Sequence, residues 1–339
     1  MKQVNVGIIN VTGYIGIDLA RLLYRHPGVN LVSVTGRSAA GEGLGDIFPH
    51  MAAAGLPITS ELGDVEVAFS ALPHAASAEA VARALERDIK VIDISADFRL
   101  KDLDVYREWY GVEHPVPELI DEAVYGLTEL YRKDIAGARL IANPGCYPTS
   151  AILALAPALK EALIEPDIII DSKSGVSGAG RTLKLTTHFC EANENLSAYA
   201  LGGHRHMPEI RQELQNIAEN EISLTFLPHL VPMTRGMLSS CYASLRSDTG
   251  IDRVLECYRE FYRGEPFVRV VDIPPQTKHT LGNNFCLIHP VIDRSTGRLM
   301  VISCIDNLVK GGAGQAIQDM NLMLGLPEAM GLEQLAIYP

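Results

Sequence analysis

Hydrophobic positions in the first third of the chain form short runs that alternate with helical patterns. Runs rich in β-branched residues predict strands, and apolar residues spaced three and four apart predict helices. The predicted strands are residues 4–9, 31–34, 65–70, 90–94 and 139–142, and the predicted helices are residues 15–24 and 76–86. Strands that alternate with helices indicate an α/β parallel sheet with crossover helices.

The pattern changes after residue 146. A helix predicted at 149–161 leads to an apolar strand at 167–170, and the later strands follow one another closely, at 222–228, 237–245, 284–292 and 299–305. Such spacing is typical of a mixed or antiparallel sheet in an α+β domain. Apolar residues at helical spacing predict a last helix at 311–324.

The length of 339 residues favours two domains. We predict a first domain of residues 1–145, to which 311–339 return, and a second domain of residues 146–310.

Composition narrows the class of protein. Hydrophobic residues make up 47% and charged residues 21%, as in folded cytosolic proteins, and the net charge is -12. This charge argues against a general nucleic-acid or anionic-membrane surface, although a local basic pocket for an anionic substrate remains compatible with it. The N-terminus shows no basic region followed by a cleavable apolar segment, and residues 4–9 are too short to span a membrane. We therefore expect a soluble, cytoplasmic protein.

The turn after the first predicted strand has the features of a dinucleotide-binding site. Glycines lie at positions 7, 13 and 16, and Asn10 stands where a related pattern carries another glycine. Asn is among the few residues that tolerate left-handed backbone angles, so the turn can still form. The helix N-terminus would supply free N–H groups to the pyrophosphate. The residues expected to bind the cofactor here are Gly7, Asn10, Thr12, Gly13, Tyr14, Ile15 and Gly16; a tight turn without cofactor is the alternative.

The end of the second strand indicates which cofactor is bound. NAD sites commonly place an acidic residue there for the ribose hydroxyl. Here Thr35 and Gly36 are followed by Arg37 and Ser38, without an acidic residue. Arg37 and Ser38 can instead hold the 2′-phosphate of NADP, unless Arg37 is simply solvated.

Cys146 is the candidate nucleophile. The chain carries six scattered cysteines without a C-x-x-C pair, so zinc and thioredoxin-like sites are disfavoured, and we expect five of the thiols to be small buried apolar groups. Cys146 differs because it lies between an apolar strand and a helix start, in the segment 143–149. A helix N-terminus favours the thiolate, and Gly145 leaves space beside the sulfur.

Two histidines precede another predicted helix. His204 and His206 flank Arg205, and Glu209 lies one turn into the helix. No Cys or carboxylate cluster with zinc spacing supports a metal site, so we expect none. A Cys thiolate and a protonated His form an activated pair, Glu209 is placed to orient His206, and Arg205 suggests an anionic ligand.

Four segments together resemble the N-acetyl-gamma-glutamyl-phosphate reductase family of arginine biosynthesis, whose superfamily also contains aspartate-semialdehyde dehydrogenase. They are residues 143–149, 95–99, 203–210 and 306–311, and the resemblance covers essentially the whole chain. It implies a Rossmann-like NADP-binding domain built from both chain ends and a central α+β domain that makes the contacts of a homo-oligomer, a dimer or a tetramer.

The resemblance also implies roles for individual residues. Cys146 matches the nucleophile and His206 the acid/base, with His204 and Glu209 in support. The implied substrate contacts are Asn143, Arg99, Ser174 and Arg205. The implied further cofactor contacts are Pro73, Gly175 and Asn307. Asn10 departs from the family pattern at the phosphate turn, which leaves the expected fold unchanged.

The implied reaction proceeds through a thioester. Cys146 would attack the acyl phosphate and expel phosphate, and NADPH would then reduce the thioester to an aldehyde. A related family reduces a carrier-protein-linked aminoadipyl phosphate in lysine biosynthesis, but the stretch 173–181 looks more like the arginine-pathway enzyme. A non-catalytic NADP-binding sensor and a cysteine hydrolase are the other classes. The intact Cys146 and His206 disfavour the sensor, and the glycines of the first turn disfavour the hydrolase.

Overall fold

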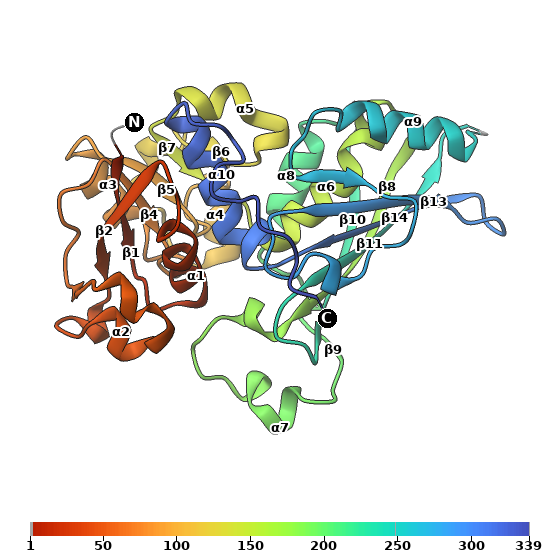
Figure 1. The fold of residues 1–339 in the computed structure, drawn as a ribbon. Helices are drawn as coiled ribbons and strands as arrows, with labels where there is room; N and C mark the ends of the chain where they lie inside the picture. Colours follow the sequence, from red (N-terminus) through yellow and green to blue (C-terminus); the bar gives the residue numbers. More distant parts are fainter. Residues whose placement is uncertain (1–2, 248, 339) are drawn as a thin grey trace. The chain divides into compact units, whose positions relative to one another are not determined.

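Two seven-stranded sheets organise the chain (Figure 1), one in each of the two units of the computed structural model. The structure describes residues 3–247 and 249–338. The first unit comprises the chain up to Pro144 together with Gly312–Glu333, and the second comprises Gly145–Gly311 and the residues from Gln334 onward.

The first sheet is entirely parallel, as the alternation of strands and helices predicts. Its strand order is β3-β2-β1-β4-β5-β7-β6. The strands are β1 Val4–Ile9, β2 Val29–Thr35, β3 Ile58–Thr59, β4 Val67–Ser70, β5 Lys90–Asp93, β6 Val124–Tyr125 and β7 Leu140–Ala142. The α-helices of this unit are α1 Tyr14–Leu23, α2 Leu44–Ile47, α3 Ala78–Leu85, α4 Leu103–Tyr110, α5 Thr128–Gly137 and α10 Gly314–Met323.

The order of this sheet reverses between β1 and β4. β2 and β3 extend from one side of β1, whereas β4 and β5 extend from the other. In open parallel sheets, ligands bind outside the carboxyl ends of the strands at this switch point. The loops after β1 and β4 are therefore the expected ligand-binding loops of the first unit.

The sheet of the second unit is mixed, in agreement with the α+β prediction. Its order is β12-β13-β14-β11-β8-β10-β9, with β8 parallel to β10 and antiparallel to β11. The strands are β8 Ile164–Gly175, β9 Ser197–Ala198, β10 Ser223–Val231, β11 Met237–Leu245, β12 Val268–Val270, β13 Cys286–Ile292 and β14 Arg298–Ile305. The α-helices are α6 Cys146–Lys160, α7 Phe189–Ala192, α8 Met207–Gln215 and α9 Ile251–Phe261.

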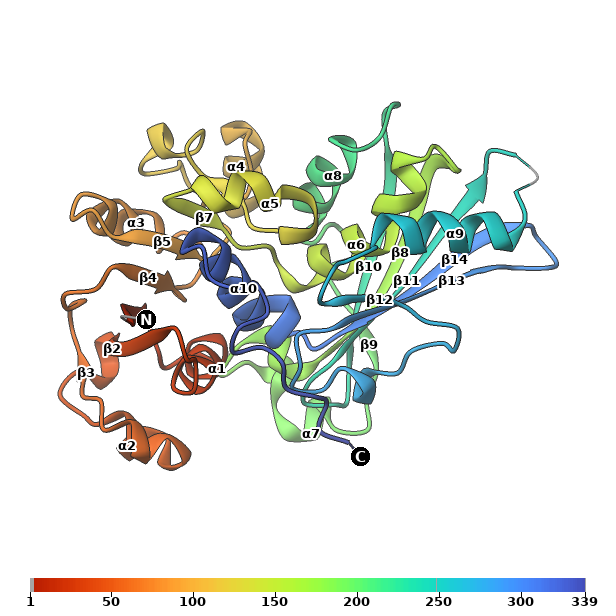
Figure 2. The same cartoon turned by 45° about the horizontal axis from the view of Figure 1, so that its top comes forward.

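Helix α6 forms the core of the second unit. Its residues from Tyr147 to Leu159 are all buried, and it packs against β11, β14, α8 and α9. Figure 2 shows α6 and α9 over the strands of this sheet. The apolar composition of α6 therefore fixes the position of its first residue, Cys146, relative to the sheet.

Short helices complete the connections. They are the 3-10 helices η1 Arg37–Ala39, η2 Pro49–Ala54, η3 Pro117–Leu119, η4 Val176–Ala179, η5 Leu185–Thr187 and η6 Thr277–His279, and the π-helix η7 Val309–Ala313. The helix predicted at 311–324 thus begins as a π-helix and continues as α10.

Candidate active site

Cys146 is the first residue of α6, where the sequence predicts a nucleophile. Its N-cap residue, Gly145, has extended backbone, and the Gly145 N–H donates to Oε1 of Glu209 at 2.9 Å. Glu209 lies in the first turn of α8 and is only 1% exposed. α8 therefore holds the turn that precedes Cys146. The sequence predicts that Glu209 orients His206, whereas this contact is with Gly145.

Gly311 lies against Cys146, and the sequence predicts no role for it. A Cβ atom built at position 311 would lie 2.7 Å from Cβ of Cys146 and 3.1 Å from its Cα. Contacts this short are not tolerated, so any side chain at this position would displace Cys146. The only sequence signal for Gly311 is its place at the end of the segment 306–311.

The two histidines occupy different positions in the second unit. The His206 N–H donates to Nδ1 of His204 at 3.1 Å, and Nε2 of His204 lies 3.4 Å from the Tyr199 hydroxyl. Burial, with the nearby charge of Arg205, lowers the pKa of His204 to about 4. His204 is therefore neutral at physiological pH, and its Nδ1 accepts a main-chain hydrogen bond.

His206 lies directly before α8 and close to the residue that follows the nucleophile. Its ring centroid is 4.9 Å from that of His204 and 5.9 Å from that of Tyr147. Because Tyr147 is the chain neighbour of Cys146, this packing brings His206 to the start of α6. Arg205, between the two histidines, is exposed.

Two tyrosines, for which the sequence predicts no role, pack together with the two histidines. The hydroxyls of Tyr147 and Tyr199 are 3.1 Å apart, and the Tyr147 hydroxyl also donates to the His229 carbonyl at 3.3 Å. Burial raises the pKa of Tyr147 well above its ordinary value, so the phenol stays protonated. Tyr147 lies inside the predicted segment 143–149, whereas no local signal marks Tyr199.

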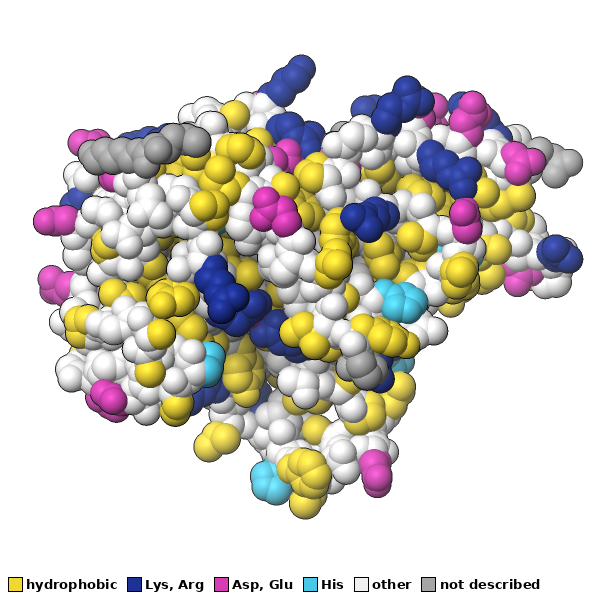
Figure 3. All heavy atoms as spheres, in the orientation of Figure 1, with side chains coloured by type: hydrophobic (Ala, Val, Ile, Leu, Met, Phe, Trp, Pro, Cys, Tyr) yellow, Lys and Arg dark blue, Asp and Glu magenta, His cyan; other side chains and the backbone are white. Residues whose placement is uncertain are grey.

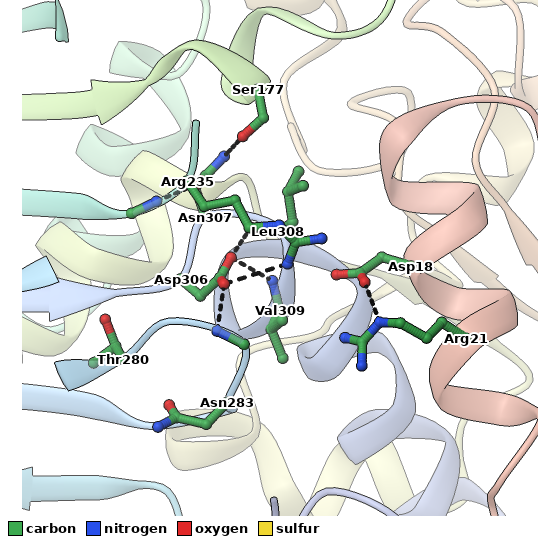
Figure 4. Close-up of polar contacts among 12 residues, drawn as sticks. Asp18, Arg21, Ser177, Arg235, Thr280, Asn283, Asp306, Asn307, Leu308 and Val309 are labelled. Atoms are coloured by element: carbon green, nitrogen blue, oxygen red, sulfur yellow. Dashed lines mark hydrogen bonds and ion pairs between the residues drawn. The ribbon is translucent and has the colours of Figure 1, made fainter. Parts of the chain in front are cut away.

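Two polar residues of the second unit that are expected to contact ligands, Asn307 and Ser174, make hydrogen bonds within the protein. The Asn307 amide accepts from Gly236 N–H at 2.8 Å and donates to Ser177 Oγ at 2.9 Å (Figure 4). Ser174 is 1% exposed, and its hydroxyl donates to the Gly175 carbonyl. Asn307 thus holds η4, which directly follows Gly175 at the end of β8.

Asp306 ties the start of the segment 306–311 to its surroundings (Figure 4). Its fully buried carboxylate accepts from Leu308 N–H at 2.8 Å and Gly282 N–H at 2.7 Å, and Arg235 lies at 3.3 Å. These bonds shape the chain that leads to Gly311.

Asn143 and Arg99, two of the predicted substrate contacts, are buried in the first unit. Nε of Arg99 donates to the Asn143 carbonyl and Nη2 to the Ile94 carbonyl, both at 2.8 Å. Arg99 therefore joins the chain after β5 to the chain after β7. Oδ1 of Asn143 is buried and has no hydrogen-bond partner within the described part of the chain.

The turn after β1 has the conformation that the sequence suggests. Asn10 has a φ of 67°, in the left-handed region, and its side chain donates to the Ala71 carbonyl at 2.9 Å. A Cβ atom at Gly16 would lie 2.6 Å from the Asn10 carbonyl oxygen, so the helix can start this close only with glycine. At Gly13, the N-cap of α1, nothing lies within 4 Å of such an atom. An open helix N-terminus of this kind fits the pyrophosphate of a dinucleotide.

Arg37 and Ser38 are exposed on η1, directly after β2. β2 ends at the buried Thr35, whose hydroxyl accepts from the Asn10 N–H at 3.1 Å. Arg37 and Ser38 are thus on the loop adjoining the first turn, and Pro73 is exposed on the turn after β4.

The cysteines depart from expectation at one position. Cys241, Cys257, Cys286 and Cys304 are buried, and burial raises the pKa of Cys257 to about 11 and that of Cys304 to about 12. Cys190 is exposed on the short helix α7, so the prediction that it is buried was wrong.

The described residues contain no group of His, Cys, Asp or Glu side chains that could hold a metal ion. None of the helices in the described ranges has the length and the hydropathy that crossing a membrane requires.

Comparison with known proteins agrees with this description. The family described as "Semialdehyde dehydrogenase, NAD binding domain" matches residues 5–138, and "Semialdehyde dehydrogenase, dimerisation domain" matches residues 146–307. An aspartate semialdehyde dehydrogenase II from Vibrio cholerae, solved in complex with ASA, superimposes with a TM-score of 0.70 at 19% identity, covering 96% of this chain and 99% of that one. One from Candida albicans, solved with NADP, superimposes with a TM-score of 0.69 at 16% identity, covering 95% and 99%. These structures share the fold.

Closer relatives identify the family. An N-acetyl-gamma-glutamyl-phosphate reductase from Dehalococcoides mccartyi is 60% identical over 100% of both chains. A second, from Pelotomaculum thermopropionicum, is 51% identical over 99% of both chains. The chain belongs to the family of N-acetyl-gamma-glutamyl-phosphate reductases.

Proposed function

We propose that this protein reduces N-acetyl-gamma-glutamyl phosphate with NADPH to N-acetylglutamate semialdehyde and phosphate, a step of arginine biosynthesis. The observation that carries the proposal is the position of Cys146 at the start of α6, on a turn held by the buried Glu209. The full-length relatives that share this chain's family bear the name of this activity.

The first step transfers the acyl group to the enzyme. The Cys146 thiolate attacks the carbonyl carbon of the acyl phosphate, a C–S bond forms, and the C–O bond to phosphate breaks. The helix N-terminus stabilises the thiolate before attack. Phosphate leaves as an anion and needs no proton from the enzyme.

The second step converts the thioester to the aldehyde. Bound NADPH supplies the hydride for this reduction. We assign to His206 the proton that goes to the developing oxyanion, which yields a thiohemiacetal on Cys146. When the C–S bond breaks, the same histidine takes the hydroxyl proton back as the aldehyde forms, and the thiolate is regenerated.

His204 fits a supporting role better than an acid/base role. Its Nδ1 accepts the His206 N–H, and its pKa of about 4 keeps the ring neutral. It therefore fixes the backbone on which His206 is carried.

We propose binding roles for the following residues. Gly7, Asn10, Thr12, Gly13, Tyr14, Ile15 and Gly16 would hold the dinucleotide at the first turn, and Arg37 and Ser38 its 2′-phosphate. The further proposed cofactor contacts are Pro73, Gly175 and Asn307. The proposed substrate contacts are Asn143, Arg99, Ser174 and Arg205. Of the two arginines, we assign the phosphate or carboxylate to Arg205, because its side chain is exposed, whereas Arg99 is buried and donates to main-chain carbonyls.

The substrate is a small molecule. We further propose that the protein is cytoplasmic and forms a homo-oligomer, a dimer or a tetramer. We also propose that it binds neither nucleic acid nor an anionic membrane, because its net charge is -12. On the face drawn in Figure 3, both acidic and basic side chains occur among apolar and neutral ones.

The direct test follows NADPH absorbance. We expect NADPH loss with N-acetyl-gamma-glutamyl phosphate, and NADP reduction when N-acetylglutamate semialdehyde and phosphate are supplied. A cofactor-binding sensor or a hydrolase would give neither signal. Faster turnover of a carrier-linked aminoadipyl phosphate than of the acetylated substrate would move the protein to the lysine-pathway activity.

A further inference from the structure

The turn that joins β4 to α3, residues 71–77, lies at the switch point of the first sheet. It begins beside the cofactor turn: Ala71 N–H donates to the Ile9 carbonyl at 2.9 Å, and the Asn10 side chain donates to the Ala71 carbonyl. Ligands of open parallel sheets bind at this edge. The shape of the 71–77 turn therefore matters for any dinucleotide held by the first unit.

One buried carboxylate holds this turn from a distant part of the sequence. Asp97 is fully buried. Its Oδ1 accepts from Ala75 N–H at 2.7 Å, and its Oδ2 accepts from Ser77 N–H at 2.9 Å and Ala78 N–H at 3.1 Å. Asp97 thus satisfies N–H groups at the start of α3, which the side chain of the N-cap residue Ser77 does not cap.

The local sequence does not favour the conformation that Asp97 holds. Ala75 has a φ of 59°, in the left-handed region that costs an alanine free energy. The short hydrogen bond from its N–H to Asp97 offsets this cost. Without the carboxylate, the turn would relax toward conformations with a negative φ at Ala75.

A second layer holds Asp97 itself. The Asp97 N–H donates to Ser95 Oγ at 3.0 Å, and Ser95 Oγ donates to Asp93 at 2.6 Å. The Tyr106 hydroxyl donates to Asp97 Oδ1 at 3.1 Å. Burial, together with the negative charge of Asp97, raises the pKa of Asp93 to about 6. The carboxylate of Asp97 is therefore fixed by groups on two segments and its main chain by Ser95, which is more than capping one helix requires.

We propose that Asp97 is a positioning residue for NADPH, which it serves by holding the 71–77 turn in its bound conformation. The inference rests on the proposed function, because it takes NADPH as the ligand of the first unit. It assigns to Asp97 an effect on cofactor affinity and none on the chemistry at Cys146.

The test compares Asp97→Asn with a matched control, Asp102→Asn. Asp102 also caps a helix, accepting from Asp104 N–H and Val105 N–H at the start of α4. NADPH affinity is measured by fluorescence titration, and the reactivity of Cys146 by its rate of alkylation with iodoacetamide. For Asp97→Asn we expect affinity to fall about tenfold, a change of about 1.4 kcal/mol, and KM for NADPH to rise with kcat at saturation nearly unchanged. The alkylation rate should stay as in wild type, and Asp102→Asn should change none of these values.

Two variants at Ala75 extend the test, and the first, made in the wild-type background, keeps it decisive if Asp97→Asn does not fold. Ala75 is exposed, so its substitution leaves the buried network in place. Ala75→Val should weaken NADPH binding, because a β-branched residue resists a positive φ. In the Asp97→Asn background, Ala75→Gly should recover part of the lost affinity, because glycine adopts this φ freely.

Three results would overturn the inference: unchanged NADPH affinity in Asp97→Asn, an equal loss of affinity and of Cys146 alkylation, or unchanged affinity in Ala75→Val. A wild-type protein that binds no NADPH would refute the proposed function instead.

Discussion

At the scale of single residues, the chemistry of the second unit depends on how the main chain is held around Cys146. Glu209 binds the N–H before the nucleophile, Gly311 leaves it room, and His204 binds the N–H of His206. The sequence predicts Cys146, His206 and Glu209 because these residue types carry recognisable chemistry. The roles of Gly311 and Tyr199 depend on contacts between distant segments, so no local pattern could reveal them.

The two histidines should respond differently to the same substitution. His206→Asn removes the acid/base group and should lower kcat about 10²–10⁴-fold and flatten one limb of the pH–rate profile. His204→Asn should cost much less, because His204 is neutral and the Asn side chain retains an acceptor. The measurement is the pH dependence of kcat for both variants. A flattened limb in His204→Asn with a normal profile in His206→Asn would reverse the assignment.

We expect single side chains to decide the choice of cofactor as well. Arg37 and Ser38 follow β2 without an acidic neighbour, and charge-assisted hydrogen bonds to phosphate contribute about 1.5–3 kcal/mol. Because Arg37 is exposed, screening reduces this gain, and we expect a preference for NADPH over NADH of about tenfold or more. Arg37→Ala should reduce kcat/KM with NADPH and leave the value with NADH nearly unchanged. Arg25→Ala, at an exposed arginine before β2, is the control. Equal losses with both cofactors in Arg37→Ala would show that Arg37 binds something other than the 2′-phosphate.

At the scale of elements, hydrophobic periodicity predicts the long strands and the buried helices, but it misses the short elements. The two-residue strands β3, β6 and β9 are too short to show any alternation. Helix α4 did carry a signal, since Asp102 caps its first turn. The π-helix η7, which contains Gly311, has no sequence signature that we recognise.

Helix α10 belongs to the first unit through buried polar contacts as well as apolar ones. The fully buried Thr128 hydroxyl, at the start of α5, donates to Asp319 at 2.7 Å and accepts from Gln315 at 3.0 Å. The apolar spacing predicted a helix here, but the buried polar face could be recognised only once α5 was placed beside it.

Thr128→Val should therefore destabilise the first unit. Valine keeps the shape of threonine but removes the donor to the buried Asp319 carboxylate, which should cost about 1–3 kcal/mol of unfolding free energy. Urea denaturation measures this change. Thr187→Val, at a threonine whose hydroxyl makes a solvent-exposed hydrogen bond to the Lys184 carbonyl, should stay within about 0.5 kcal/mol of wild type. Similar values for both variants would show that the contact with α10 contributes nothing.

At the scale of the whole molecule, the chain is two units whose sequences interleave. The first unit is completed by residues 312–333, and the second by residues from 334 onward. The sequence predicts two domains because 339 residues exceed the size of one core, and because the strand pattern changes after Cys146. How the segments after β14 divide between the units depends on packing, which periodicity alone does not specify.

Stability should fall on acidification because several histidines are buried in the neutral form. Burial lowers the pKa of His26, His114 and His204 below 6.5, so the unfolded chain takes up protons first as the pH falls. Each then lowers the unfolding free energy by up to about 1.4 kcal/mol per pH unit between 6.5 and its folded pKa. Asp93 acts in the opposite direction: its pKa of about 6 means that folding favours its protonation between about pH 6 and 3.8.

His26 offers a direct test of this balance. It is 3% exposed, its Nε2 bonds to Asn321 at 3.0 Å, and its Nδ1 accepts from Gly28 N–H. Protonation at Nδ1 would break the second bond. Urea denaturation at pH 7 and pH 5.5 should show a smaller loss of stability in His26→Gln than in wild type. An unchanged pH dependence in the variant would mean that His26 does not contribute to the acid sensitivity.

The central claim is that Cys146 carries the acyl group between the two chemical steps. The most direct measurement is intact-protein mass spectrometry after mixing the enzyme with N-acetyl-gamma-glutamyl phosphate in the absence of NADPH, with phosphate release followed in parallel. We predict one acyl group per chain, mapped to Cys146, an equal amount of phosphate, and loss of the adduct when NADPH is added. Cys146→Ser should give neither adduct nor phosphate burst. An adduct that persists in Cys146→Ser, or aldehyde formation by that variant at a tenth or more of the wild-type rate, would contradict the assignment of Cys146 as the nucleophile.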